Sequence, residues 1–348
     1  MARARRVSEL QGEPIVEVVR GKLVESVHRV AACALDAHGT VELAIGSIDT
    51  PVFLRSTAKP FIAAAAIAAG ARERFGLEPA EIAVMAASHS GQPFHAAAVA
   101  SILRKIGMDA SALQCGVHPP YNEEAARALL GAGQTPSPLH NNCSGKHAGI
   151  LALCAVIGAD PATYLQVDHP AQVQILALCA RMTGDDPQVW PLGVDGCGIP
   201  VFATSLRRAA LAFARLASLD GLTDTDARAL LTVRDAMVSY PDYVAGTGEF
   251  DSELMRVAGG GIVSKAGAEG VHGVAVMAAR LGYASKVIDG ASRGRAPASV
   301  AALHRLGVLS GVQVEALAGF ARPVLYNRAG RAVGSIRPVP SFTIELSP

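Results

Sequence analysis

The chain contains a serine three residues ahead of a lysine in R-S-T-A-K-P, residues 55–60, where an alanine-rich run begins. Side chains at positions i and i+3 of a helix share one face, with Cβ atoms about 5–6 Å apart. Lys59 can therefore reach the Ser56 hydroxyl, and a buried lysine with a lowered pKa can accept the proton of a serine nucleophile. The alternative is an ordinary helix start, with Ser56 as N-cap and Lys59 in solvent. Pro60 predicts a distorted first turn in either case, because it lacks a backbone N–H.

Two further stretches combine polar groups with turns. The first is A-S-H-S-G-Q-P-F-H, residues 87–95, in which Ser88 and Ser90 are either site residues or helix caps. The second is S-K-A-G-A-E-G, residues 264–270. A lysine in a strand that enters a glycine-rich turn is typical of the K-T-G strand of S-x-x-K enzymes. The alternative for Lys265 is a solvated strand lysine.

Two more stretches hold cysteines in polar, glycine-rich surroundings. They are H-N-N-C-S-G-K-H, residues 140–147, and V-D-G-C-G-I-P, residues 194–200. The first has a density of ionisable and amide groups that is hard to explain by helix capping alone, which is the alternative for this stretch. Cysteine thiolates with a nitrogen or oxygen ligand suit Zn²⁺. Spacing alone nominates Cys143, His147 four residues later, and Cys197, with Asp195 in support; two unrelated thiols are the alternative.

The elements that must position these residues follow a strand–helix–strand order. Valine-rich, partly alternating segments occupy the first fifty residues and turn at A-H-G-T, and short strands with glycine-rich turns return after residue 259. Between them lie alanine-rich helices, followed by a helix over 222–237 that Thr223 or Asp224 can cap. We therefore expect a mixed α/β (α+β) fold, in which both chain ends form an antiparallel sheet flanked by helices, with an inserted helical region. Residues 1–348 form a single domain, with a mixed sheet and helix part at about 1–60 and 220–348 and a helical part at about 61–219.

Composition narrows the class of protein. Half of the 348 residues are apolar and 18% are charged, so a large buried core is expected. The formal charge is +1, with no basic block beyond R-A-R-R at residues 3–6, which argues against a nucleic-acid partner. The first twenty residues lack the apolar core of a signal peptide, and the longest apolar stretches are too short to cross a membrane. A cytoplasmic protein with six reduced cysteines is expected.

Taken together and in order, these motifs resemble the rhizobial-type L-asparaginase II family. The resemblance also includes V-V-R-G-K-L-V-E-S-V-H-R near the N-terminus, so it spans nearly the whole chain. It implies a fold similar to serine β-lactamases and penicillin-binding proteins. It also implies hydrolysis of L-asparagine to L-aspartate and ammonia through two Ser–Lys tandems, Ser56 with Lys59 and Ser88 with Lys265, in a homodimer.

The resemblance further implies a role for each site residue. Ser56 is expected to be acylated because a helix N-terminus stabilises developing negative charge. Lys59 is then its general base, and Ser88 and Lys265 relay protons to the leaving ammonia. The residues expected to hold the substrate are Arg55, Asn141, His147 and Asp195. The zinc ligands implied by the family are Cys143, Lys146 and Cys197, so that Lys146 replaces the His147 that spacing nominates.

Three alternatives remain open at this stage. One is a β-lactam-recognising enzyme of the same fold, although Ala266 replaces the K-T-G threonine and no clear S-D-N triplet occurs. Another is a glutaminase, because one substrate methylene is worth only about 1–3 kcal/mol. The third is a non-catalytic protein in which zinc and the cysteines stabilise a helical domain.

Overall fold

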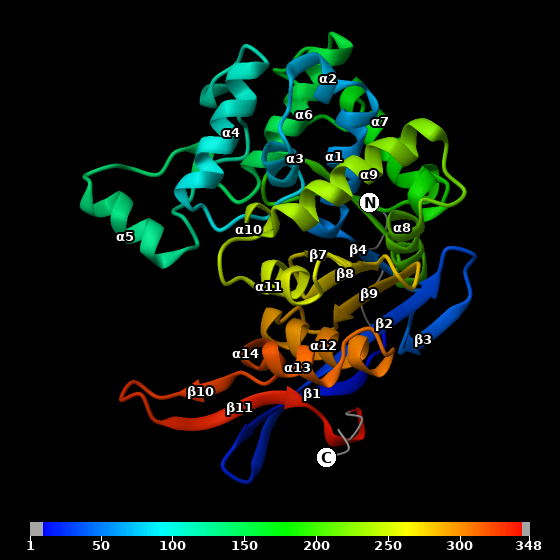
Figure 1. Ribbon diagram of the computed structural model, residues 1–348, viewed down its shortest axis with the longest axis vertical. Helices are drawn as coiled ribbons and strands as arrows, with labels where there is room; N and C mark the ends of the chain where they lie inside the picture. The colour runs from blue at the N-terminus through cyan, green and yellow to red at the C-terminus, as the bar shows by residue number, and fades with distance from the viewer. Residues whose placement is uncertain (1–9, 343–348) are drawn as a thin grey trace, which may run out of the picture.

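Both chain ends contribute to one antiparallel sheet, as the sequence predicts. The computed structural model describes residues 10–342, so the basic cluster at residues 3–6 lies outside the described part. Sheet order is β10-β11-β1-β2-β9-β8-β7, with β3 paired to β2, so the C-terminal hairpin continues the N-terminal one (Figure 1). The strands of this sheet are β1 (Glu13–Arg20), β2 (Leu23–Asp36), β3 (Val41–Ile45), β7 (Ile262–Ala266), β8 (Val271–Val276), β9 (Leu281–Val287), β10 (Val324–Tyr326) and β11 (Ala332–Pro338).

The turns expected from the sequence connect these strands. A-H-G-T lies between β2 and β3, K-A-G-A-E-G runs from β7 into β8, and N-R-A-G lies between β10 and β11. Paired strands in each of these three hairpins are antiparallel. The hairpin predictions are therefore confirmed, and β7 delivers Lys265 to the sheet edge.

The sheet is buried on both faces, because strands such as β2 carry apolar side chains on both sides. In β2, the alternate residues Ala31, Cys33 and Leu35 join one apolar core, whereas Val30, Ala32 and Ala34 join the other. Successive strand side chains point to opposite faces, so a continuous apolar run fills both sides. The first core lies toward the helical region, and the second lies toward the C-terminal helices.

A single helix, α8 (Leu206–Ser218), covers the first face by packing on β2, β8 and β9. Two glycines permit the close approach. A Cβ atom on Gly282 would lie 1.9 Å from the Ala210 carbonyl oxygen, and one on Gly273 would meet the ring of Phe213. The last helix of the predicted helical part, α8, therefore packs directly on the sheet.

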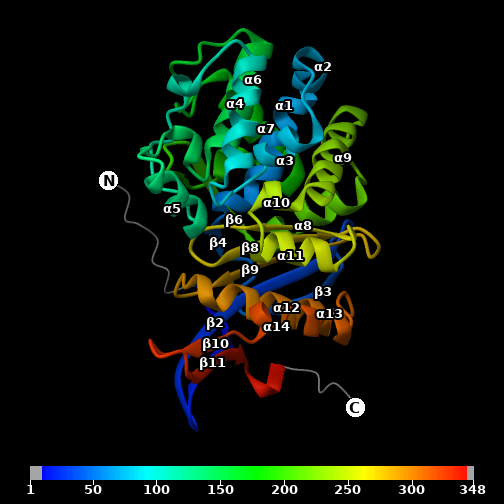
Figure 2. The same ribbon diagram turned by 60° about the vertical axis from the view of Figure 1, so that its left-hand side comes forward.

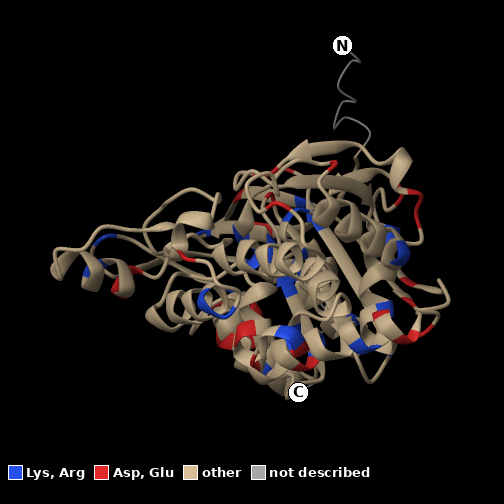
Figure 3. Cartoon of the chain, turned by 90° about the horizontal axis from the view of Figure 1, so that it is seen from above, with Lys and Arg blue, Asp and Glu red and all other residues tan. Residues whose placement is uncertain are grey.

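The other face is covered by helices of the C-terminal half. In both views α12, α13 and α14 lie between β9 and the β10–β11 hairpin, which belong to the same sheet, and α11 lies beside β8 (Figures 1 and 2). α11 packs on β7, and α12 packs on β1, β8, β9 and β11. These helices are α11 (Phe250–Val257), α12 (Arg295–Arg305), α13 (Gly311–Ala316) and α14 (Ala318–Ala321). Lys and Arg are interspersed with Asp and Glu along the chain (Figure 3).

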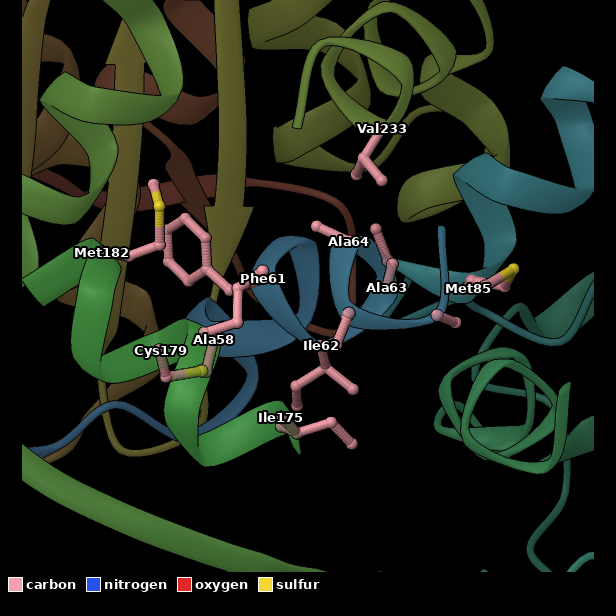
Figure 4. Packing of buried hydrophobic residues seen from close by; sticks show 14 of the residues in the cluster. Ala58, Phe61, Ile62, Ala63, Ala64, Met85, Ile175, Cys179, Met182 and Val233 are labelled. Atoms are coloured by element: carbon pink, nitrogen blue, oxygen red, sulfur yellow. The ribbon is translucent and has the colours of Figure 1, made fainter. Parts of the chain in front are cut away.

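The middle of the chain forms the helical region, with α1 at its centre. α1 is buried from Lys59 to Ile67 and packs against α6, α7 and α9, with Phe61 and Ile62 among the side chains that fill the core (Figure 4). The surrounding helices are α2 (Ala71–Phe75), α3 (Pro79–Met85), α4 (Pro93–Lys105), α5 (Glu123–Gly131), α6 (Ser144–Ile157), α7 (Pro170–Thr183), α9 (Asp224–Ser239) and α10 (Pro241–Val244), and α1 is Lys59–Ala68. Thr223 caps α9 as expected. Among residues 10–342, no helix has the length and apolar character that a membrane span requires.

Two short strands interrupt the helical region and were not expected. β5 (Leu192–Val194) and β6 (Pro200–Ser205) form a small sheet with β4 (Pro51–Phe53) in the order β4-β6-β5. The turn between β5 and β6 carries Asp195 and Cys197. Because β4 leads directly into the R-S-T-A-K-P segment, the small sheet holds this turn beside the start of α1.

Candidate active site

The R-S-T-A-K-P segment starts a helix without using its serine as a cap. Arg55–Ala58 is a 3-10 turn whose N-cap is Leu54, and α1 follows directly with Pro60 in its first turn. The predicted distortion of the first turn is present. Ser56 lies inside the 3-10 turn, and no hydrogen bond of its hydroxyl is found within residues 10–342. The capping alternative for Ser56 is therefore wrong, and its hydroxyl is free for chemistry.

Lys59 is not solvated. It is 1% exposed, and its Nζ atom lies 2.6 Å from the Ala87 carbonyl oxygen, 2.9 Å from Ser88 Oγ and 3.3 Å from Cys143 Sγ. Burial lowers the pKa of Lys59 below its usual value, although the nearby Cys143 thiolate opposes the shift. A buried lysine that contacts a serine hydroxyl and has a lowered pKa has the properties of a general base.

Ser88 sits on the loop between α3 and α4, which is anchored on both sides. Its backbone N–H donates to the Val244 carbonyl, and that of Ser90 donates to the Ala245 carbonyl. Helix α4 is capped by Gln92, which exchanges hydrogen bonds with His95 in a capping box. The capping alternative for Ser88 and Ser90 is therefore wrong as well, and the loop holds the Ser88 hydroxyl against Lys59.

Lys265 is also buried, which excludes the solvated alternative. It lies on β7, is fully buried, and donates to the Ala266 carbonyl oxygen at 2.7 Å. Its Nζ atom is 3.9 Å from Asp251 Oδ2. Burial lowers the pKa of Lys265 to about 7, with the Asp251 charge opposing the shift and the Lys59 charge adding to it. Lys265 can therefore change protonation state near neutral pH.

Asp251 organises the surroundings of Lys265 and was not among the residues expected from the sequence. Its carboxylate accepts from the Ser264 hydroxyl at 2.7 Å and from the Ala266 backbone N–H at 2.7 Å. His272 on β8 contacts the same carboxylate and the Ser264 hydroxyl. Burial opposes ionisation, but the His272 hydrogen bond and the Lys265 charge outweigh it and lower the pKa of Asp251. A lone aspartate in an amphipathic helix gives no local signal of this role.

A second cluster lies beside Lys59, where the sequence predicts zinc. Lys146 Nζ is 2.8 Å from Cys197 Sγ. The Cys197 side chain and the two neighbouring lysines lower the pKa of Cys143, whereas the Cys143 side chain and burial raise the pKa of Cys197. Burial would lower the pKa of Lys146, but the neighbouring Cys143 and Cys197 outweigh it and raise the value.

This donor set has the chemistry that Zn²⁺ prefers. It offers two thiolate sulfurs, one amine nitrogen and, from Asp195, a carboxylate oxygen 3.7 Å from Cys197 Sγ. Within residues 10–342, no group of three or more His, Cys, Asp and Glu side chains is placed to hold a metal. The ligand set implied by the family resemblance adds the amine of Lys146 to the two cysteines.

His147 points elsewhere. Its Nδ1 atom lies 2.7 Å from the Tyr164 hydroxyl, and Tyr164 also accepts from the Gln114 backbone N–H at 2.9 Å. His147 Nε2 is buried with no partner among the described residues. Burial holds the pKa of His147 well below its usual value, so its ring is neutral. Cys143 is the N-cap of α6 and its carbonyl oxygen accepts the His147 backbone N–H at 3.1 Å, so the i, i+4 relation is present, but the ring's Nδ1 contact is to Tyr164.

The other predicted substrate-binding residues make strong internal contacts. Arg55 donates from Nε and Nη2 to Asp195 Oδ1 at 3.0 and 2.7 Å, although Arg55 adopts an unusual positive φ of 52°. This pair ties the start of α1 to the turn that carries Cys197. Asn141 donates to the Cys115 carbonyl and accepts from the Cys143 backbone N–H at 2.8 Å, so it fixes the position of Cys143.

Ser56 lies between two hollows. An enclosed one is lined by Ser56, Lys59, Lys146 and Asp195 and by apolar residues of α7 and β6. The other is an open cleft of about 290 Å³, lined by both Ser56 and Ser88. The rest of its lining comprises Ser90, Tyr121, Asn142, Ala245, Glu249, Phe250, Asp251, Ala266, Gly267, Ala268 and Arg295. The cleft can admit a small molecule to both serine hydroxyls.

The family described as L-asparaginase II matches residues 16–338. No curated protein matches the chain.

Two kinds of solved structure are similar to the chain. "Mglu in its native form" is 14% identical, with 82% of this chain and 67% of that chain covered and a TM-score of 0.43. A putative beta-lactamase from Bacteroides dorei DSM 17855 is 14% identical, with 80% and 86% covered and a TM-score of 0.40. The chain thus spans about two thirds of Mglu, and neither likeness bears on the chemistry of the site.

Proposed function

Because this chain belongs to the L-asparaginase II family, we propose that it hydrolyses L-asparagine to L-aspartate and ammonia by serine–lysine catalysis. The observation that carries the proposal is the buried Lys59, whose amine touches the Ser88 hydroxyl at the wall of a cleft that Ser56 also lines. Amide hydrolysis needs a nucleophile and a base that is matched to neutral pH, and this corner of the cleft supplies both.

In the first half of the reaction, Ser56 Oγ attacks the side-chain amide carbon of asparagine, and a new C–O bond forms. The Ser56 proton passes to the neutral amine of Lys59. Lys59 returns a proton through the Ser88 hydroxyl, which it contacts, to the amide nitrogen. The C–N bond then breaks, ammonia leaves, and an aspartyl ester remains on the serine.

In the second half, a water molecule attacks the ester carbon. Its proton passes into the same relay of Ser88 and the two lysines, the ester C–O bond breaks, and the proton returns to Ser56 Oγ. L-Aspartate then leaves the cleft. Lys265, with a pKa of about 7, serves this relay because it can accept and release a proton at neutral pH.

Four residues are proposed to shape the substrate's surroundings. Arg55 and Asp195 form an ion pair beside Ser56, Asn141 fixes the turn that carries Cys143, and His147 keeps a free buried ring nitrogen. With Arg55 already bonded to Asp195, their contribution is a polar wall of fixed geometry. We expect substitution of any of these four residues to raise KM for L-asparagine while the variant still folds.

Cys143, Lys146 and Cys197 are the proposed zinc ligands, with Asp195 close by. When bound, the ion supplies positive charge beside the reacting groups. Lys146 contacts Cys197, and the thiol and the ammonium group must lose their protons to bind the ion, so we expect binding to release protons from the cluster. A cytoplasmic homodimer, expected from the family resemblance, is proposed on the same basis; size-exclusion chromatography with light scattering tests the oligomeric state.

The test of the proposed function is ammonia release by the purified chain, supplied with zinc, from L-asparagine and separately from L-glutamine. We expect kcat/KM to be at least about tenfold higher for asparagine, the discrimination that one methylene can provide. A preference for glutamine would show that the chain is a glutaminase. Cleavage of a chromogenic cephalosporin without amide hydrolysis would show that it is a β-lactam hydrolase. Release from neither amide would overturn the proposal.

A further inference from the structure

The open cleft has two charged side chains that the serine–lysine chemistry does not use. Glu249 is the N-cap residue of α11, and Arg295 is the first residue of α12. Both line the cleft that contains Ser56 and Ser88. They come from the C-terminal half of the chain, so they face the serines from the sheet side of the cleft.

Arg295 has hydrogen-bonding capacity to spare. Its Nη1 atom donates to the Gly267 carbonyl oxygen at 3.2 Å, which fixes the guanidinium beside the turn after β7. Its Nε atom is buried and has no partner among the described residues. Arg55, by contrast, spends Nε and Nη2 on Asp195. A buried donor without a partner costs free energy unless a ligand completes it.

Glu249 is the complementary group. Among residues 10–342, no hydrogen bond or ion pair of its carboxylate is found, and it does not cap α11 with its side chain. Its neighbour Asp251 is fully engaged by Ser264, Ala266 and His272. Partial burial and the Asp251 charge raise the pKa of Glu249, while the Arg295 charge lowers it. A cation beside this carboxylate would therefore be bound favourably.

We propose that Arg295 binds the α-carboxylate and Glu249 the α-ammonium group of a free amino acid whose side-chain amide lies at the serines. The inference rests on the proposed function and names its substrate class. An arginine presents paired N–H donors that match a carboxylate, and a carboxylate accepts from an ammonium group. One free cation and one free anion in a cleft of about 290 Å³ fit a zwitterion. They disfavour a peptide-bound asparagine, whose α-groups are amides.

The test is isothermal titration of the purified full chain with L-aspartate, β-alanine and succinate. β-Alanine is L-aspartate without its α-carboxylate, and succinate is L-aspartate without its ammonium group. Wild type should bind L-aspartate more tightly than either analogue. Arg295→Ala should weaken L-aspartate binding about 10- to 100-fold and leave β-alanine unchanged. Glu249→Gln should weaken L-aspartate and β-alanine and leave succinate unchanged.

The control variant is Arg305→Ala. Arg305 lies at the other end of α12, is exposed, and stacks on the Phe342 ring, so its loss should change none of the three affinities. Equal weakening of L-aspartate and β-alanine by Arg295→Ala would overturn the assignment, as would a wild type that binds none of the ligands. Because the titration needs no turnover, these outcomes are separate from a failure of hydrolysis. If the chain shows the expected ligand pattern but releases no ammonia, the assignment of Arg295 and Glu249 stands and the proposed hydrolysis is wrong.

Discussion

The Nζ atom of Lys59 lies 2.9 Å from Ser88 Oγ, across 29 positions of sequence. The sequence pairs Lys59 with the nearby Ser56, and Ser88 with Lys265. The contact instead joins a lysine of one expected tandem to the serine of the other. It makes Ser88 the direct neighbour of the first lysine, and this contact supports the proposed proton relay through Ser88.

The first prediction concerns the acylated serine. We expect the covalent aspartyl ester on Ser56, because Ser88 is held by Lys59 as a relay and the Ser56 hydroxyl has no described partner. Acid quenching during turnover, followed by peptide mass mapping, locates the ester. Ser88→Ala should slow turnover about 100-fold or more and still show the ester. An ester found on Ser88 would make Lys59 and Ser88 the nucleophile pair.

The second prediction concerns pH. Since burial lowers the pKa of Lys265 to about 7, the residue is protonated below that pH and neutral above it. If the relay needs neutral Lys265, kcat/KM for L-asparagine rises as pH increases through about 7. The Asp251 charge raises this pKa, so Asp251→Asn should move the rising limb to lower pH. A limb that stays in place in Asp251→Asn would contradict this role of Lys265.

The third prediction concerns metal content. Mass spectrometric metal analysis of the purified chain should find zinc, and Cys197→Ser should lose it because a soft thiolate ligand is removed. His147→Gln is the matched comparison: its ring is bonded to Tyr164, so this variant should retain zinc. Loss of zinc from both Cys197→Ser and His147→Gln would restore the ligand set that spacing alone suggests, and retention by Cys197→Ser would contradict both sets.

The fourth prediction concerns the packing that positions the zinc cluster. A Cβ atom on Gly145 would lie 2.0 Å from the Val84 carbonyl oxygen, because α6 begins directly against α3. Gly145→Ala should lower the free energy of unfolding by about 3 kcal/mol or prevent folding. Gly131, at the end of α5, has no atom near its missing Cβ, so Gly131→Ala should change stability by about 1 kcal/mol or less. Urea unfolding measures both, and equal stabilities would contradict the close approach.

Much of the fold could be predicted from the sequence because its patterning is local. Valine-rich strands, glycine turns and alanine-rich helices each report their own structure, and the sheet of both chain ends follows from their order. The small sheet of β4, β5 and β6 was missed because two of its strands, β4 and β5, have only three residues each and carry too little pattern. Its consequence is large, since its turn brings Asp195 and Cys197 to Arg55 and Lys146.

The site was predictable only in part, and for a different reason. The motifs identified the lysines, serines and cysteines that the fold places in one region. The pairings depend on how α3 and α6 pack on α1, which no spacing encodes. Asp251 and Arg295 illustrate this limit, because neither belongs to a recognisable sequence motif. Asp251 acquires its partner on β7, and both residues line the cleft, only in the folded structure.

The most direct test of the central claim is the rate of ammonia release from L-asparagine by Lys59→Met beside wild type, both supplied with zinc. Methionine keeps the apolar stem in a site where Lys59 is 1% exposed, so circular dichroism and thermal unfolding should confirm that the variant folds. The account predicts that wild type releases ammonia and that the folded variant loses at least about 100-fold in kcat. A folded Lys59→Met that hydrolyses L-asparagine at the wild-type rate would contradict it.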